Sequence, residues 1–119
     1  MASNSTEVTY GFGQMGSILV TDTSTITIGE FSGSSLTIPD NVVFVAITFL
    51  ADTVFDSDNA TGLAAENALL FPNSNSAPSH VDANGVVTDG VTFPRGVTIY
   101  GRWTGFKLSS GSAVAYIGY

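Results

Sequence analysis

The only histidine of the chain, His80, lies beside Ser79 and Asp82, so the three residue types of a hydrolase triad occur together. A triad needs the acid to orient one histidine nitrogen while the other takes the proton of the serine. Neighbours within one loop rarely reach that geometry, and the Gly-x-Ser-x-Gly turn that exposes a nucleophile is absent from the sequence. We therefore expect His80 to be a solvated loop residue and the chain to have no enzymatic activity.

A cluster of acids follows the most apolar segment of the chain. Asp52, Asp56 and Asp58 all occupy alternate positions of this segment, and Ca²⁺ binds carboxylate oxygens in such an arrangement. The comparison with a calcium loop fails at Ala60, and no glutamate closes the loop. Because the chain also has no cysteine, thiolate metal sites and disulfides are excluded. We expect this segment to be a polar loop and the protein to bind no metal and no cofactor. The alternative is a cation site formed by Asp52, Asp56 and Asp58.

The charge of the chain limits its partners. The net charge is −7, and Arg95, Arg102 and Lys107 are the only three cations. Binding to nucleic acid or to anionic lipid needs several cations arrayed together, and the acidic field would repel either polyanion. We therefore expect no nucleic-acid partner and no membrane partner.

The sequence also carries no targeting signal that we recognise. The first seven residues lack the basic and apolar parts of a signal peptide. The most apolar run, residues 42–51, is about half the length of a membrane span. We expect the protein to be made in a reducing cytoplasm.

Strand patterns dominate the sequence. Hydroxyl and apolar residues alternate over residues 24–30 and again over 34–38, which is typical of half-buried strands. The chain is 119 residues long and 44% hydrophobic, enough for the core of one domain. We therefore predict an all-β fold, a single small β-sandwich or β-barrel of the jelly-roll type over 1–119. Residues 1–7 are expected to be a flexible N-terminal arm, and residues 60–72 a long loop or a short helix.

The run at residues 42–51 is apolar on both faces of the expected strand. Simple alternation places Val43, Val45, Ile47 and Phe49 on one face and Val42, Phe44, Ala46 and Leu50 on the other. A strand that is apolar on both faces must be covered on both, and a small sandwich covers one. We therefore predict a homo-oligomer, with a trimer as the first choice, and place Val43, Val45, Ile47 and Phe49 at its interface.

The last third of the chain changes phase within a strand. Trp103 shares a face with Val97 and Ile99, whereas Phe106 and Leu108 fall in the opposite phase. An extra residue would restore the register, so we predict a β-bulge at Thr104–Gly105, with a positive φ at the glycine.

Aromatic residues gather in the same third. Tyr100, Trp103 and Tyr116 are large rings that anchor protein interfaces, stack on sugars or fill a core. Arg102 flanks Trp103 and is a candidate for pairing with acids on a partner. We add Tyr100, Arg102, Trp103 and Tyr116 to the predicted interface, with the core as the alternative for Trp103.

Residues 93–111 and 115–118 resemble a C-terminal signature of small structural proteins of tailed bacteriophages. The shared pattern is a Pro-Arg-Gly turn, a strand with Ile99-Tyr100-Gly101-Arg102-Trp103, a Ser-Gly turn and a closing Ala-Tyr strand. The apolar run before residues 51–55 is also similar. The resemblance implies a virion component without catalytic residues, often a trimer seated on symmetric sites of a shell.

The resemblance and the composition together favour a capsid decoration, or cement, protein. It would bind the major capsid protein or another virion protein, stabilise the shell and reside in the virion. The alternative is a head-fibre or tail-fibre tip module that binds a host glycan or receptor.

Overall fold

The computed structural model describes residues 16–28, 42–57, 62–67, 70–74 and 85–119. These ranges contain eight β-strands and no helix, so the all-β prediction is confirmed. The predicted arm over 1–7, the strand expected at 34–38, Asp58 and His80 lie outside the described residues. The strands are β1 (Ser17–Val20), β2 (Thr25–Thr27), β3 (Val43–Phe49), β4 (Thr53–Phe55), β5 (Ala64–Ala65), β6 (Thr92–Phe93), β7 (Thr98–Ser110) and β8 (Ala113–Gly118).

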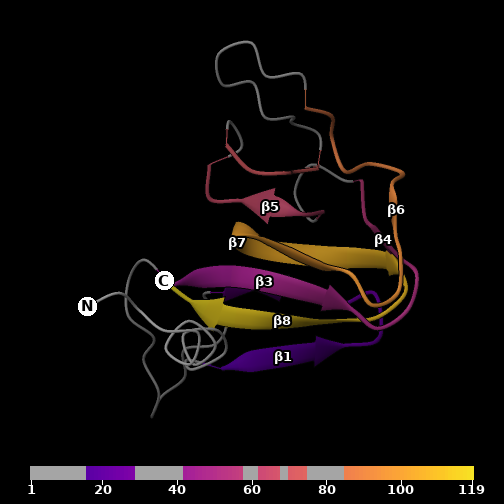
Figure 1. Ribbon diagram of the computed structural model, residues 1–119, viewed down its shortest axis with the longest axis horizontal. Coiled ribbons are helices and arrows are strands. Elements are labelled where there is room, and N and C mark those ends of the chain that lie inside the picture. Colours follow the sequence, from indigo (N-terminus) through magenta and orange to yellow (C-terminus); the bar gives the residue numbers. More distant parts are fainter. Residues whose placement is uncertain (1–15, 29–41, 58–61, 68–69, 75–84) are drawn as a thin grey trace.

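All eight strands belong to one open antiparallel sheet in the order β1-β8-β3-β7-β4-β6, with β2 and β5 also paired to β7. The long strand β7 organises this sheet. It pairs with β3 along residues 98–103, with β5 along 103–105, with β2 along 105–107 and with β4 along 108–110. Figure 1 shows β5 on one side of β7, and β3, β8 and β1 following in that order on the other.

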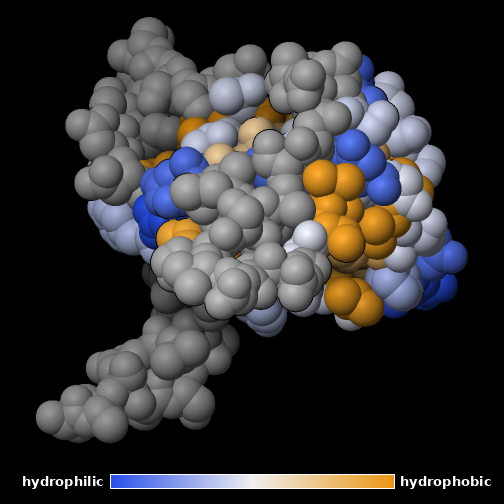
Figure 2. Space-filling view, turned by 90° about the horizontal axis from the view of Figure 1, so that it is seen from above, coloured by the Kyte–Doolittle hydropathy of each residue, from blue (hydrophilic) through white to orange (hydrophobic). Residues whose placement is uncertain are grey.

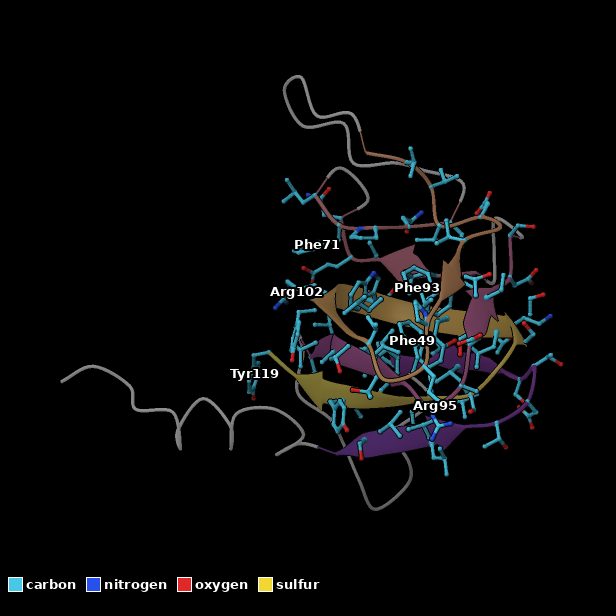
Figure 3. All side chains as sticks on the ribbon, turned by 45° about the vertical axis from the view of Figure 1, so that its right-hand side comes forward. Phe49, Phe71, Phe93, Arg95, Arg102 and Tyr119 are labelled. Carbon is cyan, nitrogen blue, oxygen red and sulfur yellow. The ribbon has the colours of Figure 1, made fainter. Side chains whose placement is uncertain are left out.

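The sheet curls around its core. The ring of Phe49 in β3 stacks on Phe93 of β6 with centroids 4.9 Å apart, and it meets Phe55 of β4 edge-on at 5.8 Å. Figure 3 shows Phe49 and Phe93 close together. In a flat sheet β3 and β6, three positions apart, would be separated by about 14 Å. The sheet is therefore bent far enough for its ends to share one core, which also contains Trp103 and Phe106.

A bulge in β3 changes which residues face this core. The register against both neighbouring strands shifts between Phe44 and Ala46, so Val45 is an extra residue relative to β8. Phe44, Ile47 and Phe49 consequently all lie in the core and are fully buried. The predicted division into two alternating faces is therefore wrong, because one inserted residue reverses the inward and outward positions beyond it.

Most of β3 is buried within the single chain. Every residue from Val42 to Ile47 is buried without a second copy, including Val43 and Val45 outside the core cluster. The argument that residues 42–51 need a second copy to cover them is therefore wrong for residues 42–47. The oligomeric state itself stays a prediction.

The bulge predicted in β7 is confirmed. Ala64 pairs with Gly105 and Ala65 with Trp103, so one step along β5 spans two residues of β7. Trp103 and Phe106 thereby both reach the core. The predicted positive φ is wrong, since Gly105 is not among the glycines with that conformation. Glycine is required there because a Cβ would lie 2.7 Å from the carbonyl oxygen of Ile26 in β2.

The helix considered within residues 60–72 is wrong for the described part of that segment, where Ala64–Ala65 forms β5. The segment is held to the sheet by hydrogen bonds instead. The indole N–H of Trp103 donates to Pro72 O at 2.8 Å, and Asn73 Oδ1 accepts from the Ala65 N–H. Ser74 Oγ accepts from the Leu63 N–H at 2.9 Å and donates to Asp56 O or to the hydroxyl of Thr88. These bonds fix extended backbone, which overrides the helical composition.

Candidate functional site

Of the three acids considered for metal binding, the two that the structure describes, Asp52 and Asp56, make contacts within the chain. Asp52 Oδ1 accepts the backbone N–H of Arg95 at 3.1 Å, and Asp56 Oδ2 lies 3.8 Å from Lys107 Nζ. Among the described residues no group of three or more acids, histidines or cysteines is placed to hold a metal ion. The site must therefore be sought among uncharged side chains.

Arg102 is used within the chain. Its Nε donates to Glu66 Oε1 at 2.7 Å and its Nη2 to Oε2 at 3.1 Å, a bidentate pair. The hydrogen bond from Arg102 lowers the pKa of Glu66, and the same bond raises the pKa of Arg102. Arg102 therefore has an acid partner within the chain, and its pairing with acids of a partner protein stays a prediction.

The structure separates the predicted interface residues into two groups. Ile47 and Phe49 are fully buried in the core of the single chain, so placing them at an interface was wrong. Trp103 is also fully buried in the core, which confirms the core alternative for this residue. Val43 and Val45 are also buried, at 2% and 8% exposure. The sequence pattern missed this because the bulges and the curl of the sheet decide which side chains face inward.

Tyr100 and Tyr116 form the second group, and they lie on the same surface of the sheet. Tyr100 of β7 and Tyr116 of β8 both pair with Ala46 of β3, which stands between them. The next row continues from Thr98 through Thr48 to Val114, and β1 adds Ser17 and Leu19. The resulting outer face consists of Ser17, Leu19, Ala46, Thr48, Thr98, Tyr100, Val114 and Tyr116, and none of these side chains is charged.

The middle of the outer face is hollowed. A hollow of about 200 Å³ is lined by five of its residues, and we call it the tyrosine hollow. Its floor is the small side chain of Ala46, and the hydroxyls of Thr48 and Thr98 bond each other at 2.7 Å along one edge. Tyr100 is 63% exposed, so its ring is open to a ligand. The lining residues are Ala46, Thr48, Thr98, Tyr100 and Tyr116.

A second surface lies where β3 ends. Leu50 and Val97 are exposed there at 45% and 40%, and we call them the apolar end. Backbone hydrogen bonds from Phe49 N–H to Val97 O and from Gly96 N–H to Phe49 O hold the two segments together. Figure 2 shows hydrophobic residues gathered on the side of the molecule where Figure 1 places β4 and β6.

Arg95 stands beside this apolar end, toward the opposite end of the strands from Tyr119 (Figure 3). It makes no ion pair with the residues that the structure describes, whereas Arg102 and Lys107 each make one. The apolar end therefore combines aliphatic side chains with a cation, a combination common in protein interfaces.

Sequence reasoning found the two tyrosines of the hollow and missed the rest of its lining. Thr98 and Tyr100 alternate along β7, which is a local signal for a shared face. Ala46 and Thr48 were missed because their pairing with β7 and β8 depends on registers between segments far apart in the chain.

Comparison with protein families, curated proteins and solved structures found no match to the chain. Among the described residues there is also no helix of the length and hydrophobicity that crossing a bilayer requires.

Proposed function

We propose that the chain is a structural protein of a tailed phage, a decoration protein that attaches to the capsid and stabilises it. It is made in the host cytoplasm, resides in the virion, binds the major capsid protein or another virion protein, and performs no catalysis. The resemblance of residues 93–111 and 115–118 to phage structural proteins supports this proposal. These residues contain the end of β6, the whole of β7 and most of β8.

The observation that carries the proposal is the apolar end with Arg95. Leu50 and Val97 each expose more than a third of their surface, although Val43, Val45 and Ile47 of the neighbouring β3 are buried. Buried aliphatic anchors retain their binding energy at high salt, whereas exposed ion pairs are screened. Attachment through the apolar end would therefore resist salt.

The apolar end is small for an interface of one copy. Stable attachment would then rely on several subunits that engage the shell together, because linked sites raise the effective concentration of one another. We therefore propose a homo-oligomer, with a trimer as the first choice. We also propose that the curled sheet belongs to the sandwich or barrel type of jelly-roll proteins.

The test is to measure the protein on purified particles of the phage that encodes it. Quantitative mass spectrometry is expected to give a copy number comparable to that of the shell subunits, and a wash at about half-molar salt should leave most copies attached. Absence from the particle would refute the proposal. A few copies at the tail would favour the fibre-tip alternative.

A variant pair tests the attachment surface. Leu50→Asp and Val97→Asp should release the protein from the shell, because each buries a charge without a partner in the interface. Val86→Asp is the control, since Val86 is 74% exposed and lies outside the apolar end. Equal melting temperatures would show that all three variants fold. Release of the control to the same extent would contradict attachment through this surface.

A further inference from the structure

The tyrosine hollow has a chemical character of its own and shares no residue with the apolar end. Four of its five lining residues carry hydroxyl groups, and the fifth is Ala46. Two of the four are phenols, whose rings offer flat apolar faces together with a polar tip. The hollow thus offers ring faces and hydroxyls at one place, with no charged side chain among the lining.

Its width suits one ring. Tyr100 and Tyr116 stand on strands two positions apart, with Ala46 between them in the same row. Strands so placed are about 9–10 Å apart, and carbon atoms in contact are about 3.5–4 Å apart. One saturated ring seated over Ala46 would therefore reach both tyrosines.

Its volume leads to the same conclusion. The hollow measures about 200 Å³, below the roughly 300–1,000 Å³ of pockets for larger organic ligands. It is also open to one side, so the rest of a longer ligand would extend over the outer face. The occupant is therefore one unit of a larger molecule or a single small ring.

Two kinds of saturated ring are candidates for this position, the pyrrolidine of proline and the pyranose of a sugar. A proline side chain has no polar atoms, so it would offer no hydrogen bond to the hydroxyl groups of the lining. A pyranose presents C–H groups on its faces and hydroxyls on its rim. When one threonine hydroxyl donates to the other at 2.7 Å, the second keeps its proton for a ligand. The hydroxyl-rich lining favours the sugar.

The charge of the ligand follows from the chain. No cation lines the hollow, and the net charge of −7 repels anions. We propose that the tyrosine hollow is a binding site for a neutral pyranose unit of a glycan, stacked between Tyr100 and Tyr116 above Ala46. This site goes beyond attachment to the shell: it would let the protein hold a glycan while the apolar end holds the particle.

The experiment uses the full chain and simple probes. Methyl glycosides of glucose, galactose, mannose and N-acetylglucosamine are titrated to tens of millimolar while amide NMR shifts are followed. At least one glycoside should bind and shift the amides of Ala46, Thr98 and Tyr100. Sialic acid and a proline-rich peptide are run in parallel. No binding by any neutral glycoside, or stronger binding by sialic acid or the peptide, would overturn the proposal.

Variants then assign the site. Tyr100→Ala should weaken binding by about tenfold or more, because it removes one of the two stacking faces. Thr98→Val, which keeps the shape and removes a hydroxyl, should weaken it less. Tyr119→Ala is the matched control, since Tyr119 is 68% exposed and does not line the hollow. Equal loss in the control would place binding elsewhere.

The proposed sugar site and the proposed attachment to the particle are tested independently, because different variants disrupt them. Tyr100→Ala should leave attachment to the shell unchanged, and Leu50→Asp should leave sugar binding unchanged. A Tyr100→Ala protein that falls off the particle would show that the hollow is the attachment surface and would overturn the sugar site. A protein that binds sugar but is absent from particles would refute only the decoration function.

Discussion

Replacing Gly105 by alanine tests why β7 needs a glycine at its bulge. The added Cβ would lie 2.7 Å from the carbonyl oxygen of Ile26. To restore ordinary van der Waals contact at 3.4 Å, the backbone of β2 must retreat by about 0.7 Å. That movement strains the pairing of Thr27 with Gly105 and of Ile26 with Phe106.

The size of the effect is the balance of two contributions. Overpacking of this kind costs about 1–3 kcal/mol. Alanine in place of glycine within a strand stabilises the folded state by about 0.5–1 kcal/mol, because it reduces the conformational freedom of the unfolded chain. This gain applies at Gly105 because its φ is not positive. The two contributions leave a net loss of about 0–2.5 kcal/mol in the free energy of unfolding, centred near 1 kcal/mol. A loss of about 1 kcal/mol lowers the melting temperature by about 4 °C in a chain of this size.

Urea unfolding followed by the fluorescence of Trp103 measures this loss. Trp103 is the only tryptophan and is fully buried, so its emission reports on the core. The midpoint should fall while the slope stays constant. Gly105→Asn distinguishes the two explanations, because asparagine tolerates a positive φ but carries the same Cβ. If asparagine were tolerated and alanine were not, backbone conformation rather than the close approach of β2 would be the reason for the glycine.

Three further predictions concern polar contacts. Ser74→Ala should lower the free energy of unfolding by about 2–3 kcal/mol, because it leaves the buried Leu63 N–H without its acceptor; urea unfolding checks this against Ser17→Ala on the exposed β1. Trp103→Phe should lower the free energy of unfolding by about 1–3 kcal/mol and loosen residues 70–74, because Pro72 O loses its hydrogen-bond donor. Hydrogen exchange of the Ser74 amide should become faster, and an unchanged exchange rate would contradict this prediction. The lowered pKa of Glu66 means that its pair with Arg102 stabilises the fold above the ordinary glutamate value of 4.5, and that this contribution disappears as pH falls through the lowered value. Because both side chains are exposed, the effect is small, and the difference in melting temperature between the parent and Glu66→Gln should shrink in acid and in high salt.

The local pattern of the sequence predicted much of the fold. Alternation of polar and apolar residues has a period of two in any strand, whatever the strand pairs with, so β2, β7 and β8 were recognisable. The bulge at Thr104–Gly105 was also predictable, because the change of phase between Trp103 and Phe106 lies within one strand. The helical composition near residue 65 was misleading, because the backbone N–H groups of Leu63 and Ala65 donate hydrogen bonds to Ser74 and Asn73 and so hold that segment extended.

The candidate sites depended on tertiary structure. The bulge at Val45 has no signal in a run where every residue is apolar, yet it decides that Phe44 and Ile47 face the same core. Ile47 and Phe49 were expected at an interface, and the curl of the sheet buries them. Which aromatic residues remain on the surface is therefore settled by how the sheet bends.

The sequence by itself determined that the chain is all-β, has no cysteine and has three cations against ten acids. These properties depend on composition and on short-range periodicity, which need no knowledge of distant contacts. Only the tertiary structure decided that Tyr100 and Tyr116 flank Ala46, and that Leu50 and Val97 are exposed at one end. The physical reason is register: residues more than fifty positions apart become neighbours only when the strands pair, and a single bulge reverses which side chains face outward.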